Sequence, residues 1–143
     1  MSVVAAPGTA ANAVRGSLKL VFGLVPVVAG LDKFANLLTA WGRYLAPQLA
    51  QTLPVGPRTF MHAVGVIEIA AGVGLLLTPW TRVFAWIVAL WLFGISLDLI
   101  LAGYYDVAVR DIVMATSALC LARLSAPELV RTTPPLAERP QGA

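Results

Sequence analysis

Two long apolar segments follow each other in this chain: TFMHAVGVIEIAAGVGLLL at residues 59–77 and, after the tripeptide TPW, TRVFAWIVALWLFGISLDLILA at residues 81–102. A helix needs roughly 20 mostly apolar residues to cross the hydrocarbon layer of a bilayer. Both segments reach that length, and the three residues between them allow only a tight turn. This pattern predicts a hairpin of two membrane-spanning helices.

The composition extends this prediction to the whole chain. Its 143 residues suggest a single domain. Hydrophobic residues make up 59% and charged residues 12%, whereas an average soluble domain is about half apolar and about a quarter charged. So few polar side chains cannot cover a water-facing surface, and we therefore expect an integral membrane protein whose main partner is the lipid bilayer. Its basic residues are scattered rather than clustered, which argues against a nucleic-acid partner.

Residues 17–38 and 106–124 are also long and apolar, so the predicted fold is an all-α integral membrane four-helix bundle. The turns TPW and GYY are short, with Gly103 expected as a helix C-cap. The first connection is longer and partly interfacial, with Trp41 and Tyr44 suited to the headgroup level. The domain prediction is a flexible tail at 1–14, a transmembrane domain at 15–125, and a disordered tail at 126–143.

The distribution of basic residues predicts the orientation of the chain. Four spans place both termini on one side, together with Arg15, Lys19, Arg82, Arg123, Arg131 and Arg139. The opposite side then carries Arg43 and Arg58, with Lys33 and Arg110 set aside because they lie within helices. Because Lys and Arg concentrate in cytoplasmic segments, we expect a multi-pass protein of the cell's inner membrane with both termini in the cytoplasm.

Ionisable residues inside the predicted spans are the main functional signal. Each span carries at least one acid, and all of these residues lie in the outer half of the bilayer. A charge at a helix centre costs about 2.5–3.5 kcal/mol on insertion scales, so such residues face inward, pair, or line water. The candidates for a buried polar cluster are Asp32, Lys33, Glu68, Asp98, Arg110 and Asp111. Peripheral candidates are His62, Tyr104 and Asp106.

Small residues share helix faces with several of these acids, which indicates close helix packing there. Glu68 lies on a face with Gly65, Ala71 and Gly72, Asp98 lies one turn after Gly94, and Asp111 shares a face with Ala115, Ala118 and Ala122. Helical side chains lean toward the N-terminus of their own helix. We therefore expect Asp32, Glu68 and Asp98 to converge on one level of the bundle.

Structural roles compete with functional ones at most of these positions. Lys33 and Asp106 can extend to the surface, Arg110 and Asp111 can clamp helices, and Asp98 can tie one helix to another. His62 suits an interface, and the tryptophans Trp80, Trp86 and Trp91 suit a lipid belt as well as a quinone-stacking box. Glu68 is hardest to explain structurally, because its carboxyl is short and its position deep. The single cysteine, Cys120, excludes an intrachain disulfide, and neither a metal site nor a catalytic residue can be assigned.

Three segments resemble the DoxX-like family of small four-helix membrane proteins: GLVPVVAGLDKFANLLTAWGRYLAP, FMHAVGVIEIAAGVGLLLTP and YYDVAVRDIVMATSALCLARLS. The most recognisable elements are Gly23 with Ala29–Lys33, Glu68 with Ala71 and Gly72, and the pair Arg110 and Asp111. The resemblance implies a role in membrane-associated redox chemistry, because some members are similar to subunits of a thiosulfate:quinone oxidoreductase. It implies no catalytic residues.

Three functions remain open from the sequence. The first is a redox-associated membrane subunit that binds a quinone, with no electron-carrying cofactor of its own and a redox enzyme as partner. It would be a subunit of a quinone-linked oxidoreductase rather than an enzyme as an isolated chain. The second is a small proton-coupled transporter, since intramembrane acids often relay protons. The ionisable residues do not, however, continue into the cytoplasmic half of the predicted spans. The third is a structural or assembly subunit, including a homo-oligomer.

Overall fold

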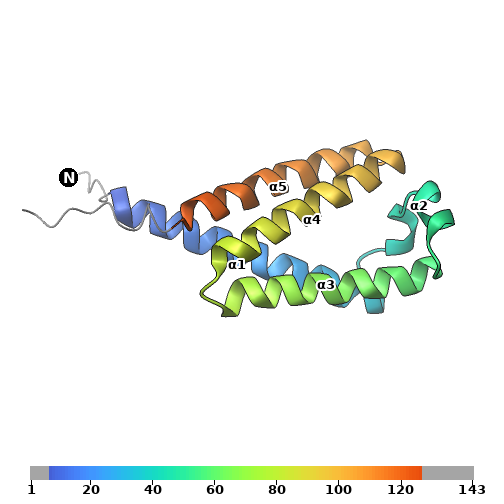
Figure 1. The fold of residues 1–143 in the computed structure, drawn as a ribbon, viewed down its shortest axis with the longest axis horizontal. Coiled ribbons are helices and arrows are strands. Elements are labelled where there is room, and N and C mark those ends of the chain that lie inside the picture. Colours follow the sequence, from blue (N-terminus) through green and yellow to red (C-terminus); the bar gives the residue numbers. More distant parts are fainter. Residues whose placement is uncertain (1–6, 127–143) are drawn as a thin grey trace, which may run out of the picture.

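The computed structural model describes residues 7–126, and this part of the chain is helical without any strand. Figure 1 shows the long helices side by side, with short helical segments at one end. The helices are α1 Pro7–Ala35, η1 Trp41–Tyr44, α2 Pro47–Thr52, α3 Pro57–Leu77, α4 Thr81–Leu101 and α5 Tyr105–Leu124. The expectation of an all-helical chain is confirmed, and the predicted C-terminal tail lies outside the described residues except for Ala126.

Helix α1 begins earlier than the hydropathy suggested. It starts at Pro7 rather than Ser17, so the predicted flexible tail is wrong for residues 7–14. Proline has its φ preset for the first turn of a helix, and the alanine-rich sequence that follows has high helix propensity. Hydropathy marks where a helix becomes apolar enough for lipid, whereas the helix itself extends further.

Helix α1 also ends earlier than predicted, at Ala35 rather than Leu38. Asn36 adopts a φ of 52°, in the left-handed region where helices commonly end. The Asp32 carboxylate then accepts hydrogen bonds from the backbone N–H groups of Leu37, at 2.9 Å, and Leu38, at 3.1 Å. The chain therefore leaves the helix because a side chain within its last turn binds the backbone beyond it.

Three helical segments are long and apolar enough to cross a membrane: Gly8–Ala35, Pro57–Leu77 and Thr81–Leu101. Helix α5 is 20 residues long, but it includes Asp106, Arg110, Asp111 and Arg123 and is not among these three segments. By length and composition, the described chain is thus a multi-pass helical membrane protein with three clear candidate spans.

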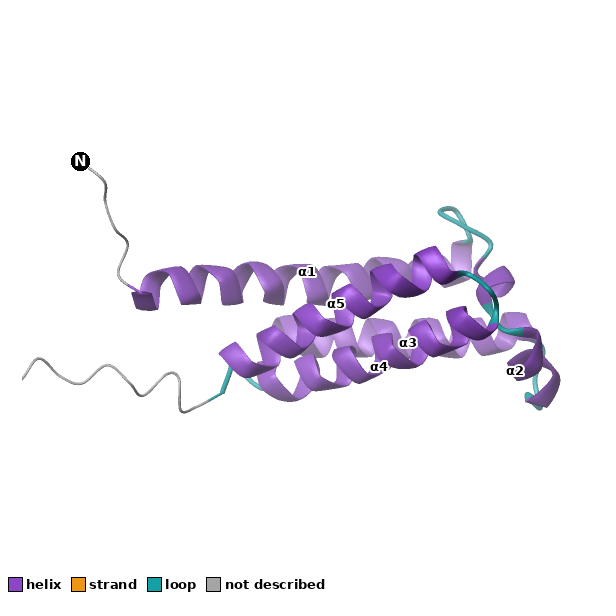
Figure 2. Cartoon of the chain, turned by 90° about the horizontal axis from the view of Figure 1, so that it is seen from above, coloured by secondary structure: helices purple, strands orange, loops and turns teal. Residues whose placement is uncertain are grey.

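The long helices pack as two close pairs, α1 with α3 and α4 with α5, as Figures 1 and 2 show. Glycines bring α1 and α3 together: a Cβ built on Gly30 would lie 2.6 Å from the Gly65 carbonyl oxygen, and one on Gly72 would overlap the Gly23 carbonyl oxygen. The helices of the other pair, α4 and α5, carry small buried residues instead, among them Ala85, Ala89, Ala115, Ala118 and Ala122. Small residues thus mark both packing faces, as membrane helix packing predicts.

One predicted packing residue proves to be unpacked. A Cβ on Gly94 would meet no atom within 4 Å, so this glycine lies outside the contacts between the described helices. Spacing along α4 put Gly94 near Asp98 but could not show which face of α4 meets its neighbours.

The two pairs meet around an apolar core toward the end of the bundle where α1 begins, here called the terminal end. Phe22, Leu75, Val88 and Leu121 lie in this core. Arg15 Nε donates to Ser125 Oγ at 3.2 Å, and Lys19 Nζ donates to the Thr78 carbonyl at 3.3 Å. These cations lie beside the C-terminal ends of α5 and α3, where the helix dipole is negative.

The turn between α4 and α5 lies at the opposite end, here called the loop end. Gly103 has a φ of 83°, which confirms the predicted glycine cap. Its N–H donates to the Ile100 carbonyl at 3.1 Å, and the Tyr104 N–H donates to the Leu99 carbonyl at 2.9 Å. This is the Schellman arrangement, in which the turn satisfies carbonyls that the helix leaves free.

Residues 36–56, here called the capping loop, join α1 to α3 at the loop end (Figure 2). The loop contains η1 and α2, and its length agrees with the expectation of a longer first connection. Leu45 is 6% exposed and Ala46 is fully buried. The loop is therefore packed into the end of the bundle.

Candidate functional site

A buried ion pair joins α1 to α3. Lys33 Nζ lies 2.6 Å from Glu68 Oε2, and the two side chains are 5% and 7% exposed. The glycine contacts between α1 and α3 place the pair, since Gly30 and Gly65 lie one turn before Lys33 and Glu68 respectively. Lys33 therefore does not extend to the surface, which was its competing structural interpretation.

Trp41 of the capping loop covers this ion pair. Lys33 Nζ lies 3.8 Å from the centroid of the indole ring, a cation–π contact. The indole Nε1 donates to Asp32 Oδ2 at 2.7 Å. Trp41 is thus held by Asp32 against the Lys33 ammonium.

Asp98 of α4 has a different partner in the same loop. Its Oδ1 accepts a hydrogen bond from the Ala46 backbone N–H at 3.0 Å. Asp32, Glu68 and Asp98 therefore each bind a different group, and their convergence on one level of the bundle stays a prediction. A buried loop must satisfy its own N–H groups, and Asp32 and Asp98 serve that need.

Two further polar side chains lie near the ion pair. Asp111 of α5 is 6% exposed, and it is close enough to interact electrostatically with Lys33 and Glu68. Trp91 of α4 points its indole nitrogen toward the Glu68 carboxylate. Among the described residues, neither Trp91 Nε1 nor Asp111 Oδ1 has a partner in hydrogen-bond geometry. Lys33, Glu68, Trp91 and Asp111, here called the buried polar cluster, therefore come from four different helices.

Arg110 stands outside this cluster. Its side chain is 67% exposed, and its Nε lies 3.5 Å from Asp111 Oδ1 on the same helix. This contact between neighbouring residues of α5 does not clamp two helices together.

Trp91 was named in the sequence analysis only as one of three tryptophans, and the other two, Trp80 and Trp86, are exposed. Trp91 lies seven residues, about two helical turns, before Asp98 and so on the same face of α4. This spacing was the signal that Trp91 faces the bundle.

The peripheral candidates form no second site. His62 stacks on Phe34 with ring centroids 4.9 Å apart, and its Nε2 is buried without a partner among the described residues. Tyr104 packs edge-on against Tyr44 at 4.9 Å, and Asp106 is exposed. Within residues 7–126, no three His, Cys, Asp or Glu side chains come together as a potential metal site.

Arg43 and Tyr44 form a polar contact in the capping loop, outside the spanning helices. The guanidinium donates to the Tyr44 hydroxyl oxygen at 2.7 Å. This hydrogen bond lowers the pKa of the Tyr44 phenol and raises the pKa of Arg43. The contact therefore ties the Arg43 guanidinium to its neighbour Tyr44 at the loop end.

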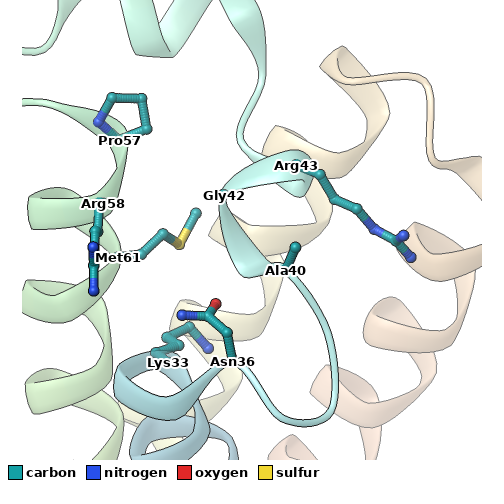
Figure 3. A pocket seen from close by; sticks show the side chains of 8 residues that line it. All are labelled: Lys33, Asn36, Ala40, Gly42, Arg43, Pro57, Arg58 and Met61. Atoms are coloured by element: carbon teal, nitrogen blue, oxygen red, sulfur yellow. The ribbon is translucent and has the colours of Figure 1, made fainter.

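A pocket of about 560 Å³ opens beneath the capping loop, beside the buried polar cluster (Figure 3). It lies between the end of α1, the 3₁₀ turn η1 and the start of α3. Its lining residues are Lys33, Asn36, Ala40, Gly42, Arg43, Pro57, Arg58 and Met61. Lys33 is the one residue that belongs both to this lining and to the cluster.

Apolar spans, glycine-mediated packing and a buried polar cluster define a small polytopic helical membrane protein. A family model described as DoxX matches residues 15–100, which is more than half of the chain. The chain therefore belongs to the DoxX family, as its resemblance indicated. The match ends before α5, so the likeness of Arg110 and Asp111 to the family stays a prediction. Searches of curated proteins and of solved structures returned no significant match.

Proposed function

We propose that this DoxX protein is a quinone-binding membrane subunit of a redox system, with the buried polar cluster as its binding site. One observation carries the proposal: the cluster retains unused hydrogen-bonding capacity in an apolar bundle. Buried polar groups are almost always paired, yet Trp91 Nε1 and Asp111 Oδ1 form no hydrogen bond of good geometry among the described residues, where Arg110 Nε lies 3.5 Å from Asp111 Oδ1. A ligand that accepts from one and bonds to the other would satisfy both.

A quinone suits this chemistry. Its carbonyl oxygens accept hydrogen bonds, for which Trp91 and the Lys33 ammonium are the available donors. Reduction to the quinol consumes two electrons, which come from a redox partner protein, and two protons, which are taken up from the loop side and passed on by Glu68 and Asp111. The exposed side chains of Ile67 and Ile112 adjoin these acids in sequence and face the lipid, where the apolar tail of a quinone resides.

The apolar core counts against a transport pathway. Between the cluster and the terminal end the core is apolar, and the described parts of the four long helices carry no Asp, Glu, Lys, Arg or His from Leu20 to Leu31, from Ile69 to Leu77, from Val83 to Leu97 or from Ile112 to Ala122. A proton that reaches Glu68 thus finds no relay across the rest of the bilayer. This favours proton exchange on the loop side alone.

Quinone binding by the purified full-length chain tests the proposal. In a mild detergent, calorimetric titration with a short-chain quinone should give one site per chain. Trp91→Phe removes a donor to the quinone carbonyl, and we expect it to weaken binding about tenfold. Trp86→Phe, at an exposed position of the same helix, should bind like the wild type. No binding by the wild-type chain would refute the proposal, and equal affinities of the two variants would refute the assignment to this cluster.

We further propose that α5 is a fourth membrane-spanning helix, that the protein lies in the inner membrane, and that both of its termini are in the cytoplasm. The structure places Arg15, Lys19, Arg82 and Arg123 at the terminal end, and Arg131 and Arg139 come after α5 in the sequence. The loop end carries Arg43, Arg58 and Arg110. Six basic residues against three support this orientation under the positive-inside rule.

Site-directed cysteine labelling measures the orientation directly. In a Cys120→Ala background, Tyr105→Cys should react with an impermeant maleimide added to intact cells, because Tyr105 is 65% exposed at the loop end. Gly8→Cys, at the start of α1, should react only after permeabilisation. The reverse pattern would place the capping loop in the cytoplasm.

A further inference from the structure

Helix α1 is longer than the other long helices, and its excess length projects beyond the terminal end of the bundle. It has 29 residues, whereas α3, α4 and α5 have 20 or 21, so at 1.5 Å per residue it is about 12 Å longer. Figures 1 and 2 show its first turns extending past the ends of its neighbours. Because a helix of about 20 residues matches the hydrocarbon layer, the terminal ends of α3, α4 and α5 lie at the level of lipid headgroups.

Two cations of α1 lie where the neighbouring helices end. Arg15 and Lys19 are four residues apart, and so on one face of α1, and both are half-buried. Arg15 Nε donates to Ser125 Oγ, which follows α5, and Lys19 Nζ donates to the Thr78 carbonyl oxygen, which follows α3. Both acceptors are neutral groups. These contacts therefore hold the two cations against the end of the bundle without neutralising them.

No acid in the described part of the chain balances these charges. Each acid within residues 7–126 lies at least nine residues from the terminal end of its helix, which is about 13 Å at 1.5 Å per residue. The dipoles of α3 and α5 supply roughly half a negative charge each, which offsets about one of the two cations. Because a charge withdrawn from water is costly unless it is paired, this end is suited to an added ligand with one negative charge.

A buried hydroxyl group at the same end lacks a hydrogen-bond partner. Thr81, the first residue of α4, is 1% exposed, and its Oγ1 is unpaired among the described residues. It shares a helix face with the core residues Ala85 and Val88, so it faces the inside of the bundle. The tight turn from α3 places it three residues after Thr78, whose carbonyl binds Lys19. An unused hydrogen-bonding group therefore accompanies the unbalanced charge.

We propose that the terminal end binds the headgroup of an anionic phospholipid, with the phosphate held by Arg15, Lys19 and the Thr81 hydroxyl. A phosphate diester carries one negative charge, and its oxygens accept hydrogen bonds from cationic donors. The exposed residues 8–14 of α1 leave the space beyond this end open to a lipid. A zwitterionic phospholipid suits the site less well, because its ammonium group would add positive charge to an end that is already cationic.

The lipid site is independent of quinone binding. It lies toward the opposite end of the bundle from the buried polar cluster, and the two sites share no residue. Loss of quinone binding in Trp91→Phe therefore leaves the lipid site intact, and loss of lipid binding in Arg15→Gln leaves the Trp91 donor in place.

The test uses the full-length chain, delipidated in a neutral detergent, with bound lipids counted by native mass spectrometry. The probes are dioleoyl phosphatidylglycerol and dioleoyl phosphatidylcholine, which carry the same acyl chains. We expect one tight site for phosphatidylglycerol, and Arg15→Gln should weaken it about tenfold. Arg123→Gln removes an equal charge from an exposed position in the last turn of α5 and should leave the affinity unchanged. Circular dichroism of each variant confirms that the helices are intact.

Thr81→Val distinguishes a ligand contact from a structural one. Valine has the shape of threonine without the hydroxyl, and removing an unpaired buried hydroxyl should leave the delipidated chain at least as stable as the wild type. The same substitution should nevertheless weaken phosphatidylglycerol binding. A less stable delipidated Thr81→Val chain would show that the hydroxyl is already paired inside the protein, contrary to the proposal.

Three other results would overturn the inference. Equal affinities for the two lipids would remove the preference for an anionic headgroup. Equal weakening by Arg15→Gln and Arg123→Gln would indicate diffuse attraction to surface charge rather than a site. Displacement of phosphatidylglycerol by an equal concentration of inorganic phosphate would assign the site to a soluble phosphate instead of a lipid.

Discussion

Substituting Lys33 by methionine, or Glu68 by leucine, will lower the free energy of unfolding by about 3–5 kcal/mol, the cost of leaving one partner of a buried ion pair alone. The two groups are 2.6 Å apart and almost fully buried. Each single variant therefore leaves a charge that water cannot reach, and the remaining group must be neutralised at a cost in free energy. The measurement is reversible unfolding in detergent micelles, followed by circular dichroism.

The double variant Lys33→Met/Glu68→Leu should recover most of this loss. Replacing a whole buried ion pair by apolar side chains of similar size is often neutral or stabilising, and the surroundings here are apolar. A thermodynamic cycle over the four chains gives the coupling energy directly. Additive losses in the double variant would show that the pair does not act as a unit, and a negligible loss in both single variants would place the two groups in contact with water.

The second large effect concerns the close approach of α1 and α3. Gly30→Ala and Gly72→Ala should each destabilise the protein by about 1–3 kcal/mol, the typical cost of overpacking. A methyl group at either position meets backbone rather than a movable side chain: the Gly65 carbonyl oxygen at 2.6 Å for Gly30, and the Gly23 carbonyl oxygen for Gly72. The helices must move apart, because a backbone carbonyl within a helix cannot rotate away.

Gly94→Ala is the matched control, since its new methyl group would meet nothing within 4 Å. Alanine is favoured over glycine inside a helix by about 0.5–1 kcal/mol, so this variant should unfold at the same or a slightly higher denaturant concentration. Gly30→Ala should also weaken quinone binding, because Gly30 lies one turn before Lys33 on the same helix. If Gly94→Ala were destabilised while Gly30→Ala kept the stability of the wild type, Gly94 rather than Gly30 would lie at a close helix contact, and the packing described here would be wrong.

The fold class could be read from the sequence because membrane insertion depends on local properties. Hydropathy over about 20 residues predicted three of the helices to within two residues, and Gly103 was placed correctly because a helix followed by glycine has a local signature. The start of α1 at Pro7 was missed, since helicity there depends on alanine content rather than on hydropathy.

The candidate site, like the fold, could be predicted from the sequence only in part. That Lys33, Glu68 and Asp111 lie inside the bundle followed from the cost of exposing charge to lipid, and all three are buried. Their pairing did not follow, because periodicity along one helix does not give its rotation and depth relative to another. Trp91 as a neighbour of Glu68, and Asp32 as the partner of Trp41, required contacts between segments far apart in the chain.

The sequence by itself therefore determined that this is a helical membrane protein, and it identified three segments that are long and apolar enough to cross a bilayer. Only the tertiary structure decided which acids serve which purpose. The capping loop draws Asp32 and Asp98 to its own donors, and the glycine contact of α1 with α3 brings Lys33 to Glu68. The physical reason is that hydropathy and helix propensity act within a segment, whereas satisfying a buried polar group depends on which segment lies beside it.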